Sequence, residues 1–381
     1  MEKIIFNNPR RLVIGENSLD QFTADFLSAG FSRLFILLIP PVIDKLQPVL
    51  SAFSQNGIEV KTYAYLKEEP SFDDFNEILN IVQEFKADSI AGIGGGSVLD
   101  VAKLLAAMLY SPMQVERVVG IGLITGRKTF LACIPTTAGT GSEVSPNSIL
   151  LDKRENLKKA IISPFLVPDI VYIDPLLTVS LPPSATAFTG IDALTHCIEA
   201  YANHFAHPVT DNLALEGIRL ICANLVKAVE NGNDKEARSN LALASMYGGM
   251  CLGPVNTAAV HALAYPLGSI FKVAHGLSNA LLLPYVMEYN LSAAASRYAD
   301  IARSAGSEIK GTDMEVALNG IYIIKEIIKR CGLPLRLSDI GITENAVETM
   351  AESAFSVQRL LKNNVKVLTL QDIKDIYSKA L

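Results

Sequence analysis

The chain has 381 residues, which is more than a usual single domain holds, so two domains are expected. Half of the residues are hydrophobic, 19% are charged, and the formal net charge is −6, which favours large cores and argues against nucleic-acid binding. The five cysteines are scattered and form no CxxC pair, so we expect reduced thiols rather than a disulfide framework.

The N-terminal segment does not have the pattern of a signal peptide, because Arg10 and Arg11 interrupt it and no continuous apolar stretch is present. The apolar run Leu34–Val42 is too short to span a bilayer. These features predict a cytoplasmic protein with neither a membrane nor a nucleic-acid partner.

Strand-like and helix-like segments alternate through the first half of the chain. Buried strands are expected at Leu34–Ile39, Val60–Tyr65, Ser89–Ile93 and Phe130–Ile134. Helices are expected up to about Gln55, over Phe72–Phe85, and from the GGGS sequence to about Leu109. Such alternation favours an α/β fold with a parallel sheet covered by helices on both faces.

The pattern changes after Val171–Pro175, and the Leu181-Pro182-Pro183 sequence interrupts the chain. Beyond it nearly every segment has a helical pattern, with helices expected over Ala185–Phe205, Pro208–Glu230, Asp234–Cys251 and Val255–Phe271. We therefore expect an α/β domain over residues 1–180 and an all-helical domain over residues 181–381.

A glycine-rich loop follows the strand at Ser89–Ile93 and opens a helix. Gly94, Gly95, Gly96 and Ser97 would let the backbone approach a ligand, and the helix start offers free N–H groups that bind phosphate. The sequence is neither GxGxxG nor a P-loop, and a tight strand-to-helix turn would also explain it.

A second polar loop, Pro135–Glu143, follows the strand at Phe130–Ile134. Its hydroxyls belong to Thr136, Thr137, Thr140 and Ser142, and they suit a diphosphate or a ribose. Both loops lie at the carboxyl ends of predicted parallel strands, where open α/β sheets bind ligands. Together they favour a nucleotide.

Four residues of the helical half could bind one metal ion. Asp192 and His196 are four residues apart, which places them on one face of a helix, while His261 and His275 lie in other apolar surroundings. Imidazole and carboxylate suit Fe(II) or Zn(II). A single buried histidine is usually a hydrogen-bonded core residue, so spacing alone does not establish this site.

The chain resembles the iron-containing (group III) alcohol dehydrogenase family over almost its whole length. The resemblance runs through five motifs in the family's order and spacing: Phe6–Arg11, Gly94–Lys103, Pro135–Glu143, Gly190–Glu199, and His261–Gly268 followed by His275-Gly276.

The resemblance implies an N-terminal Rossmann-like dinucleotide-binding domain, a C-terminal all-helical metal-binding domain, and an active site between them. It implies Fe(2+), or Zn(2+), on Asp192, His196, His261 and His275. It also implies NAD(H) or NADP(H) on the two loops, at the residues Gly94, Gly95, Gly96, Ser97, Val98, Asp100, Thr136, Thr137, Thr140, Ser142, Lys158 and Leu177.

The implied reaction is hydride transfer between a primary alcohol, or a diol, and the nicotinamide, with an aldehyde on the other side of the reaction. The metal would lower the pKa of the alcohol, and the cofactor would carry the hydride. A homodimer is common in relatives and is expected here.

Two departures from the family concern the chemistry. Ile39 stands where many relatives carry an acidic residue that repels a 2′-phosphate, so NADP(H) is not excluded. Tyr265 replaces a second histidine that is usually assigned to proton relay, and the ordinary phenol pKa of ~10 makes it a poor shuttle near neutral pH.

Two further departures from the family concern loops. Leu252, Gly253 and Pro254 leave more room than usual where the substrate pocket is expected, and Asn363–Lys366 replaces a common Asn-Pro-Arg sequence.

The alternative functions are a maleylacetate reductase-like enzyme, a glycerol dehydrogenase-like or dehydroquinate synthase-like enzyme, and a nucleotide-binding module with impaired catalysis. The intact ligand motifs favour the alcohol dehydrogenase.

Overall fold

A computed structural model describes residues 3–66, 69–155 and 157–381. The chain forms two compact units. One contains Phe6–Thr137 and Ser142–Thr178, and the other contains Val179–Leu381 together with Ala138–Gly141 and the N-terminal residues up to Ile5. Among the described residues, no helix combines the length and the hydrophobicity that crossing a membrane requires.

The first unit is built on a six-stranded sheet with the order β1-β9-β6-β4-β2-β3, in which every pair is parallel. Its strands are β1 (Arg11–Ile14), β2 (Arg33–Leu38), β3 (Glu59–Tyr63), β4 (Ser89–Gly94), β6 (Phe130–Pro135) and β9 (Ile170–Ile173). The predicted parallel α/β fold is confirmed. The edge strand β1 was not predicted, because it has only four residues and none of them is buried.

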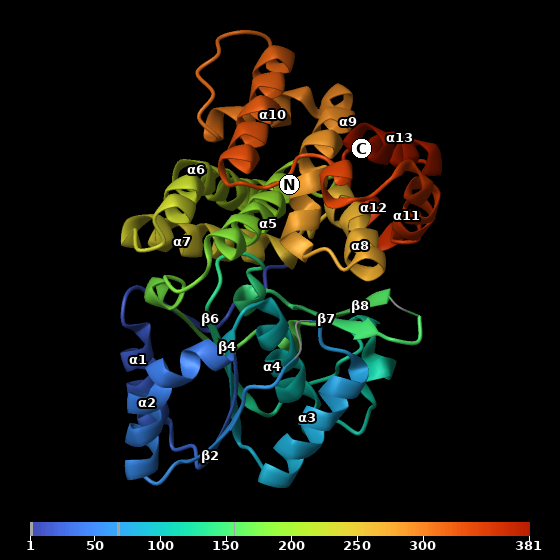
Figure 1. Cartoon of the computed structure of the whole chain (residues 1–381). Helices are drawn as coiled ribbons and strands as arrows, with labels where there is room; N and C mark the ends of the chain where they lie inside the picture. The colour runs from blue at the N-terminus through green and yellow to red at the C-terminus, as the bar shows by residue number, and fades with distance from the viewer. Residues whose placement is uncertain (1–2, 67–68, 156) are drawn as a thin grey trace. The chain divides into compact units, whose positions relative to one another are not determined.

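Helices cover both faces of this sheet, as the alternation predicts (Figure 1). On one face, β2 packs through Leu34, Ile36 and Leu38 against α1 (Ser18–Ala29) and α2 (Ile43–Gln55). On the other face, the ring of Phe35 lies against that of Phe85 at the end of α3 (Phe72–Phe85), and α4 (Gly96–Met108) follows β4. The all-apolar sequence of β2 therefore reflects burial on both sides.

A second sheet of three strands in the same unit was not predicted. Its order is β5-β8-β7, with β5 (Gly120–Ile121) parallel to β8 (Leu157–Ile162) and β7 (Asn147–Asp152) antiparallel to β8. Most residues of β8 are only half-buried, and two of them are lysines. A strand of this kind lacks the apolar run that identified the other strands.

The second unit consists of helices (Figure 1). They are α5 (Pro183–Tyr201), α6 (Pro208–Glu230), α7 (Lys235–Leu252), α8 (Ala259–Phe271), α9 (His275–Ser304), α10 (Asp313–Arg330), α11 (Val347–Phe355), α12 (Gln358–Leu361) and α13 (Leu370–Ala380). The predicted helical character of this half is confirmed.

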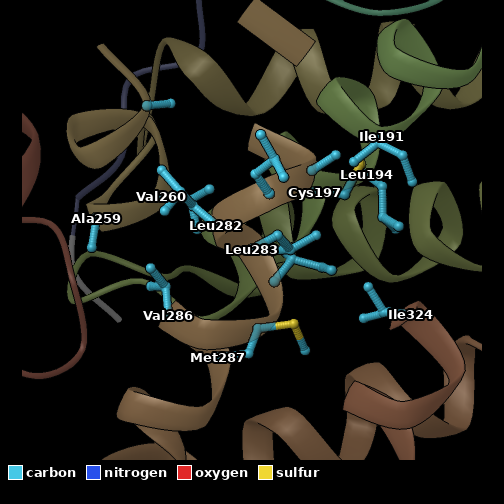
Figure 2. Close-up of a cluster of buried hydrophobic side chains, with 14 of the residues drawn as sticks. Ile191, Leu194, Cys197, Ala259, Val260, Leu282, Leu283, Val286, Met287 and Ile324 are labelled. Carbon is cyan, nitrogen blue, oxygen red and sulfur yellow. The ribbon is translucent and has the colours of Figure 1, made fainter. Parts of the chain in front are cut away.

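One hydrophobic core holds α5, α8, α9 and α10 together (Figure 2). Leu194 of α5, Val260 of α8 and Leu283 of α9 are all at most 1% exposed. Burying side chains of this size contributes about 1.5–3 kcal/mol each, before the entropy of ordering the chain is subtracted. The three helices that carry the candidate metal ligands are therefore fixed by apolar packing next to the ligands themselves.

The segment Ala138–Gly141 belongs to the helical unit although both of its neighbours in sequence belong to the sheet unit. A Cβ atom on Gly141 would lie 2.4 Å from the Cα atom of Gly249 in α7, and one on Gly139 would lie 2.8 Å from the Cβ atom of Thr189 in α5. Glycine at both positions lets this backbone pack directly on the helices.

Candidate metal centre and cofactor loops

Helix α5 presents a row of buried polar side chains. Asp192, His196 and Glu199 are 3%, 5% and 4% exposed. Their spacing of four and seven residues places them on one face of the helix. The opposite face of α5 is occupied by Ile191, Leu194 and Cys197, which lie in the hydrophobic core. The helix therefore points its polar row away from that core.

The structure brings the sequence-predicted histidines to Asp192. One donor atom each from Asp192, His261 and His275 lies within 4.8 Å of the other two. The Nε2 atoms of His261 and His275 lie 3.5 Å and 3.6 Å from Oδ1 of Asp192. His275 is the first residue of α9 rather than a loop residue after α8.

His196 lies beside Asp192, His261 and His275 but is not part of the compact group that these three residues form. Its Nε2 atom is 3.8 Å from Oδ1 of Asp192, and its ring stacks on that of His261 with 4.7 Å between the centroids. The group whose donor atoms all lie within 4.8 Å of one another contains only Asp192, His261 and His275 among the described residues.

These separations fit one divalent metal ion. Ligand bonds of ~2.0–2.2 Å in a tetrahedral site place neighbouring donor atoms roughly 3.4 Å apart. The measured separations of 3.5, 3.6 and 3.8 Å are close to that value. One carboxylate and three imidazoles suit Fe(II) and Zn(II) alike. The residues present therefore fit the metal that the family resemblance implies.

The charges of this cluster are strongly coupled. Burial would raise the pKa of Asp192, but His196, His275 and His261 together hold it well below its usual range. Burial would lower the pKa of His261, but the carboxylates of Glu199 and Asp192 raise it to about 10. The pKa of His196 is lowered, chiefly by burial. A metal cation on Asp192 would compete with the histidine protons.

Two residues of this cluster were missed by the sequence analysis as functional candidates. Oε2 of Glu199 lies 2.6 Å from Nδ1 of His261. Nδ2 of Asn279, a fully buried residue of α9, donates to Oδ1 of Asp192 at 2.7 Å and lies 3.3 Å from Nε2 of His261. The position of Glu199 seven residues after Asp192 was a usable signal, whereas the role of Asn279 depends on the tertiary fold.

Tyr265 lies one helical turn after His261 on α8 and is half-buried. Its ring centroid is 6.3 Å from that of His275. The structure therefore brings Tyr265 to the edge of the metal cluster.

The departure at Asn363–Lys366 has a structural role. Asn363 donates from Nδ2 to the carbonyl of Thr257 at 2.7 Å, and Asn364 exchanges side-chain hydrogen bonds with Asn290. Both asparagines are buried. They tie the C-terminal segment to α9 and to the residues that precede α8.

The first glycine loop joins β4 to α4. Gly94 ends the strand, Gly95 precedes the helix in an extended conformation, and Gly96, Ser97 and Val98 form the first turn. A Cβ atom on Gly94 would lie 2.7 Å from the side chain of Val98, which explains the glycine there. None of the described side chains caps this helix start, and helix N-termini of this kind favour phosphate binding.

The second loop starts beside the first one. The N–H of Thr136 donates to the carbonyl of Gly94 at 3.0 Å. A Cβ atom on Gly95 would lie 3.3 Å from the methyl group of Thr137. The hydroxyl of Thr136 is buried and has no hydrogen-bond partner among the described residues. Thr140, by contrast, belongs to the segment that packs with the helical unit.

Asp100 and Ser142 are held by contacts within the sheet unit. Oδ1 of Asp100 accepts a hydrogen bond from the Ser142 hydroxyl, and Oδ2 accepts one from the N–H of Ile149 at 2.9 Å. The ammonium group of Lys103 lies 3.3 Å from Oδ1 of Asp100 and donates to Ser142. These contacts position the second loop on α4 and β7.

The remaining sequence-predicted positions are separate from these contacts. Lys158 lies on β8 and pairs with Glu69 at 2.7 Å. Leu177 ends a short 3-10 helix and is buried among the apolar residues of the sheet unit. Ile39 follows β2 and donates from its N–H to the carbonyl of Ile93. No carboxylate is supplied at that strand end by Ile39, Pro40 or Pro41.

Two family models match the chain. Residues 9–175 match the iron-containing alcohol dehydrogenase model, and residues 186–381 match the C-terminal model of the Fe-containing alcohol dehydrogenase family.

Individual proteins are also similar to the chain over most of its length. The chain is 37% identical over 376 residues to long-chain-alcohol dehydrogenase 1 of Geobacillus thermodenitrificans, covering 96% of this chain and 94% of that one. It is 35% identical to a 1,3-propanediol dehydrogenase of Klebsiella pneumoniae, covering 85% and 84%. A solved 1,3-propanediol oxidoreductase aligns over 100% of both chains with a TM-score of 0.94 and 31% identity.

Proposed function

The chain belongs to the iron-containing alcohol dehydrogenase family, and we propose that it interconverts a primary alcohol or diol and the matching aldehyde, with a nicotinamide cofactor as hydride partner. The observation that carries this proposal is the group of Asp192, His261 and His275, whose donor atoms lie within 4.8 Å of one another and of which the first two residues are buried. The relatives named as alcohol and 1,3-propanediol dehydrogenases support this substrate class.

We propose that Asp192, His196, His261 and His275 bind one Fe(II) ion, with Zn(II) as the other candidate. The ion would supply Lewis-acid polarisation of the substrate oxygen. Oδ1 of Asp192 lies 3.5–3.8 Å from the Nε2 atoms of all three histidines, so this carboxylate is their shared neighbour. Asp192, His196 and His261 are buried, and burial strengthens electrostatic interactions among them.

The hydroxyl of Tyr265 is the proposed hydrogen-bonding group beside this cluster, in place of the histidine that many relatives carry. Its position one turn after His261, with its ring 6.3 Å from that of His275, supports this role. A Tyr265→Phe variant should therefore lower turnover while leaving the metal content unchanged. Equal turnover in the variant and the wild type would contradict the role.

The cofactor is proposed to bind at Gly94–Val98 and at the hydroxyls of Thr136, Thr137, Thr140 and Ser142, with Lys158 and Leu177 nearby and Asp100 fixing the second loop. The uncapped start of α4 supports a pyrophosphate there. Because Ile39 carries no charge, we propose that NADP(H) is accepted as well as NAD(H). A homodimer and a cytoplasmic location stay predictions.

The test is a screen of primary alcohols, diols and aldehydes on iron-reconstituted protein with both cofactors. We expect cofactor reduction or oxidation at 340 nm that depends on the metal and on Asp192. Lack of turnover with every substrate, on protein that holds one metal per chain, would contradict the proposed activity. A strong preference for NAD(H) would contradict only the proposal about Ile39.

A further inference from the structure

We propose that Glu199 is a positioning residue that fixes the imidazole of His261, so that Nε2 of this histidine is the atom offered to the metal. The proposal rests on the proposed metal site. Glu199 lies on α5 on the same face as Asp192 and His196, and it is 4% exposed. A buried carboxylate needs hydrogen-bond partners that compensate for its lost hydration, so the partners of Glu199 indicate what it positions.

Both carboxylate oxygens of Glu199 contact the start of α8. Oε2 lies 2.6 Å from Nδ1 of His261, and Oε1 accepts a hydrogen bond from the N–H of Val260 at 2.5 Å. Helix α8 begins at Ala259 and has no side-chain cap of its own. Glu199 therefore caps this helix from a neighbouring helix, and its negative charge is favourable at a helix N-terminus.

The same contact selects the tautomer of His261. A proton on Nδ1 is donated to the carboxylate, which leaves Nε2 as the atom with a lone pair for a metal. Nε2 is the atom that faces the cluster, 3.5 Å from Oδ1 of Asp192. The backbone contact to Val260 and the side-chain contact to His261 thus fix both the helix start and the ring that it carries.

Only a glutamate satisfies both donors. A carboxylate has two acceptor oxygens, whereas a glutamine has one and would turn an NH₂ group toward Val260 or His261. An aspartate is one methylene shorter and would reach at most one of them.

The experiment measures metal binding rather than turnover. Full-length wild type, Glu199→Gln and Glu199→Asp are stripped with a chelator, and Zn(II) affinity is measured by competition with a chromophoric chelator. Co(II) absorption spectra report the ligand field at the site. Tyr285→Phe is the matched control, because it removes a hydroxyl of the same helical unit that donates to the carbonyl of Leu335 at 2.9 Å.

We expect Glu199→Gln to bind Zn(II) about 10–100-fold more weakly and to shift the Co(II) spectrum. Glu199→Asp should bind several-fold more weakly, which keeps the test valid if the glutamine variant folds poorly. Tyr285→Phe should match the wild type. Wild-type affinity and spectrum in both Glu199 variants would overturn the positioning role alone. A wild type that binds no metal would overturn the proposed function together with it.

Discussion

Lys103 is a fully buried cation of the sheet unit and offers a sharp test of how the second glycine-containing loop, Pro135–Glu143, is held. It is 0% exposed. Its ammonium group donates to the carbonyls of Ser142 (2.8 Å), Ser145 (3.3 Å) and Asn147, and to the Ser142 hydroxyl, beside the carboxylate of Asp100. Lys103→Met would keep most of the side-chain volume and remove every one of these contacts.

The expected loss of stability is large. Removing one partner of a buried ion pair costs about 3–5 kcal/mol, because the remaining charge and carbonyls stay buried without a donor. For a unit of this size, each kcal/mol lowers the melting temperature by roughly 2–4 °C, so we expect a drop of roughly 6–20 °C. Differential scanning calorimetry at pH 7 measures it.

Lys159→Met is the matched control. Lys159 lies on β8 of the same unit, is partly exposed and pairs with Glu155 at 2.5 Å. A surface pair of this kind contributes about 1 kcal/mol or less. If Lys103→Met and Lys159→Met melt within 2 °C of each other, Lys103 does not organise the loop. Fluorescence titration with NAD(P)H should show weaker binding for Lys103→Met than for the control.

Two other variants test burial and close packing. Burial raises the pKa of Glu143 from 4.5 to about 7. As the pH rises, the carboxyl group therefore ionises in the unfolded chain before it ionises in the folded one, and the free energy of unfolding falls progressively between about pH 4.5 and pH 7. Urea unfolding should therefore show Glu143→Gln gaining up to about 3 kcal/mol over the wild type at pH 8 and little at pH 4.5; an equal difference at both values would contradict this sign. A Cβ atom on Gly249 would lie 2.3 Å from the carbonyl oxygen of Gly141, so Gly249→Ala should lose about 1–3 kcal/mol or more in thermal melts. Gly126→Ala, whose Cβ atom would meet nothing within 4 Å, should not, and equal melting of the two variants would refute the packing argument.

The parts of the fold that rest on local patterns were predictable. The apolar runs of β2 and β4 and the helical periods of α3 and α6 identify these elements, because each buries a continuous face. The β7–β8 hairpin was missed, since most of its residues are only partly buried and its apolar runs are no longer than three residues. The transfer of Ala138–Gly141 to the helical unit was also missed, because it depends on glycine contacts with distant helices.

In the candidate site, too, local patterns predicted some residues, whereas others are brought in only by the tertiary fold. The spacing of Asp192 and His196 and the motifs around His261 and His275 predicted residues that the structure brings together. The spacing of Glu199 from Asp192 indicates that they share a helix face, but the contact of Glu199 with His261, 62 positions away, depends on the tertiary fold. Asn279 is likewise a neighbour of Asp192 only because α9 packs against α5.

The most direct test of the account is metal-dependent turnover in the wild type and in Asp192→Asn. Chelator-treated protein is titrated anaerobically with Fe(II), while metal content and NAD(P)H formation from 1,3-propanediol and longer primary alcohols are measured in the same samples. The account predicts that activity returns as one equivalent of metal binds, and that Asp192→Asn neither retains the metal nor recovers activity. Turnover that is unaffected by metal removal, or full activity in Asp192→Asn, would contradict it.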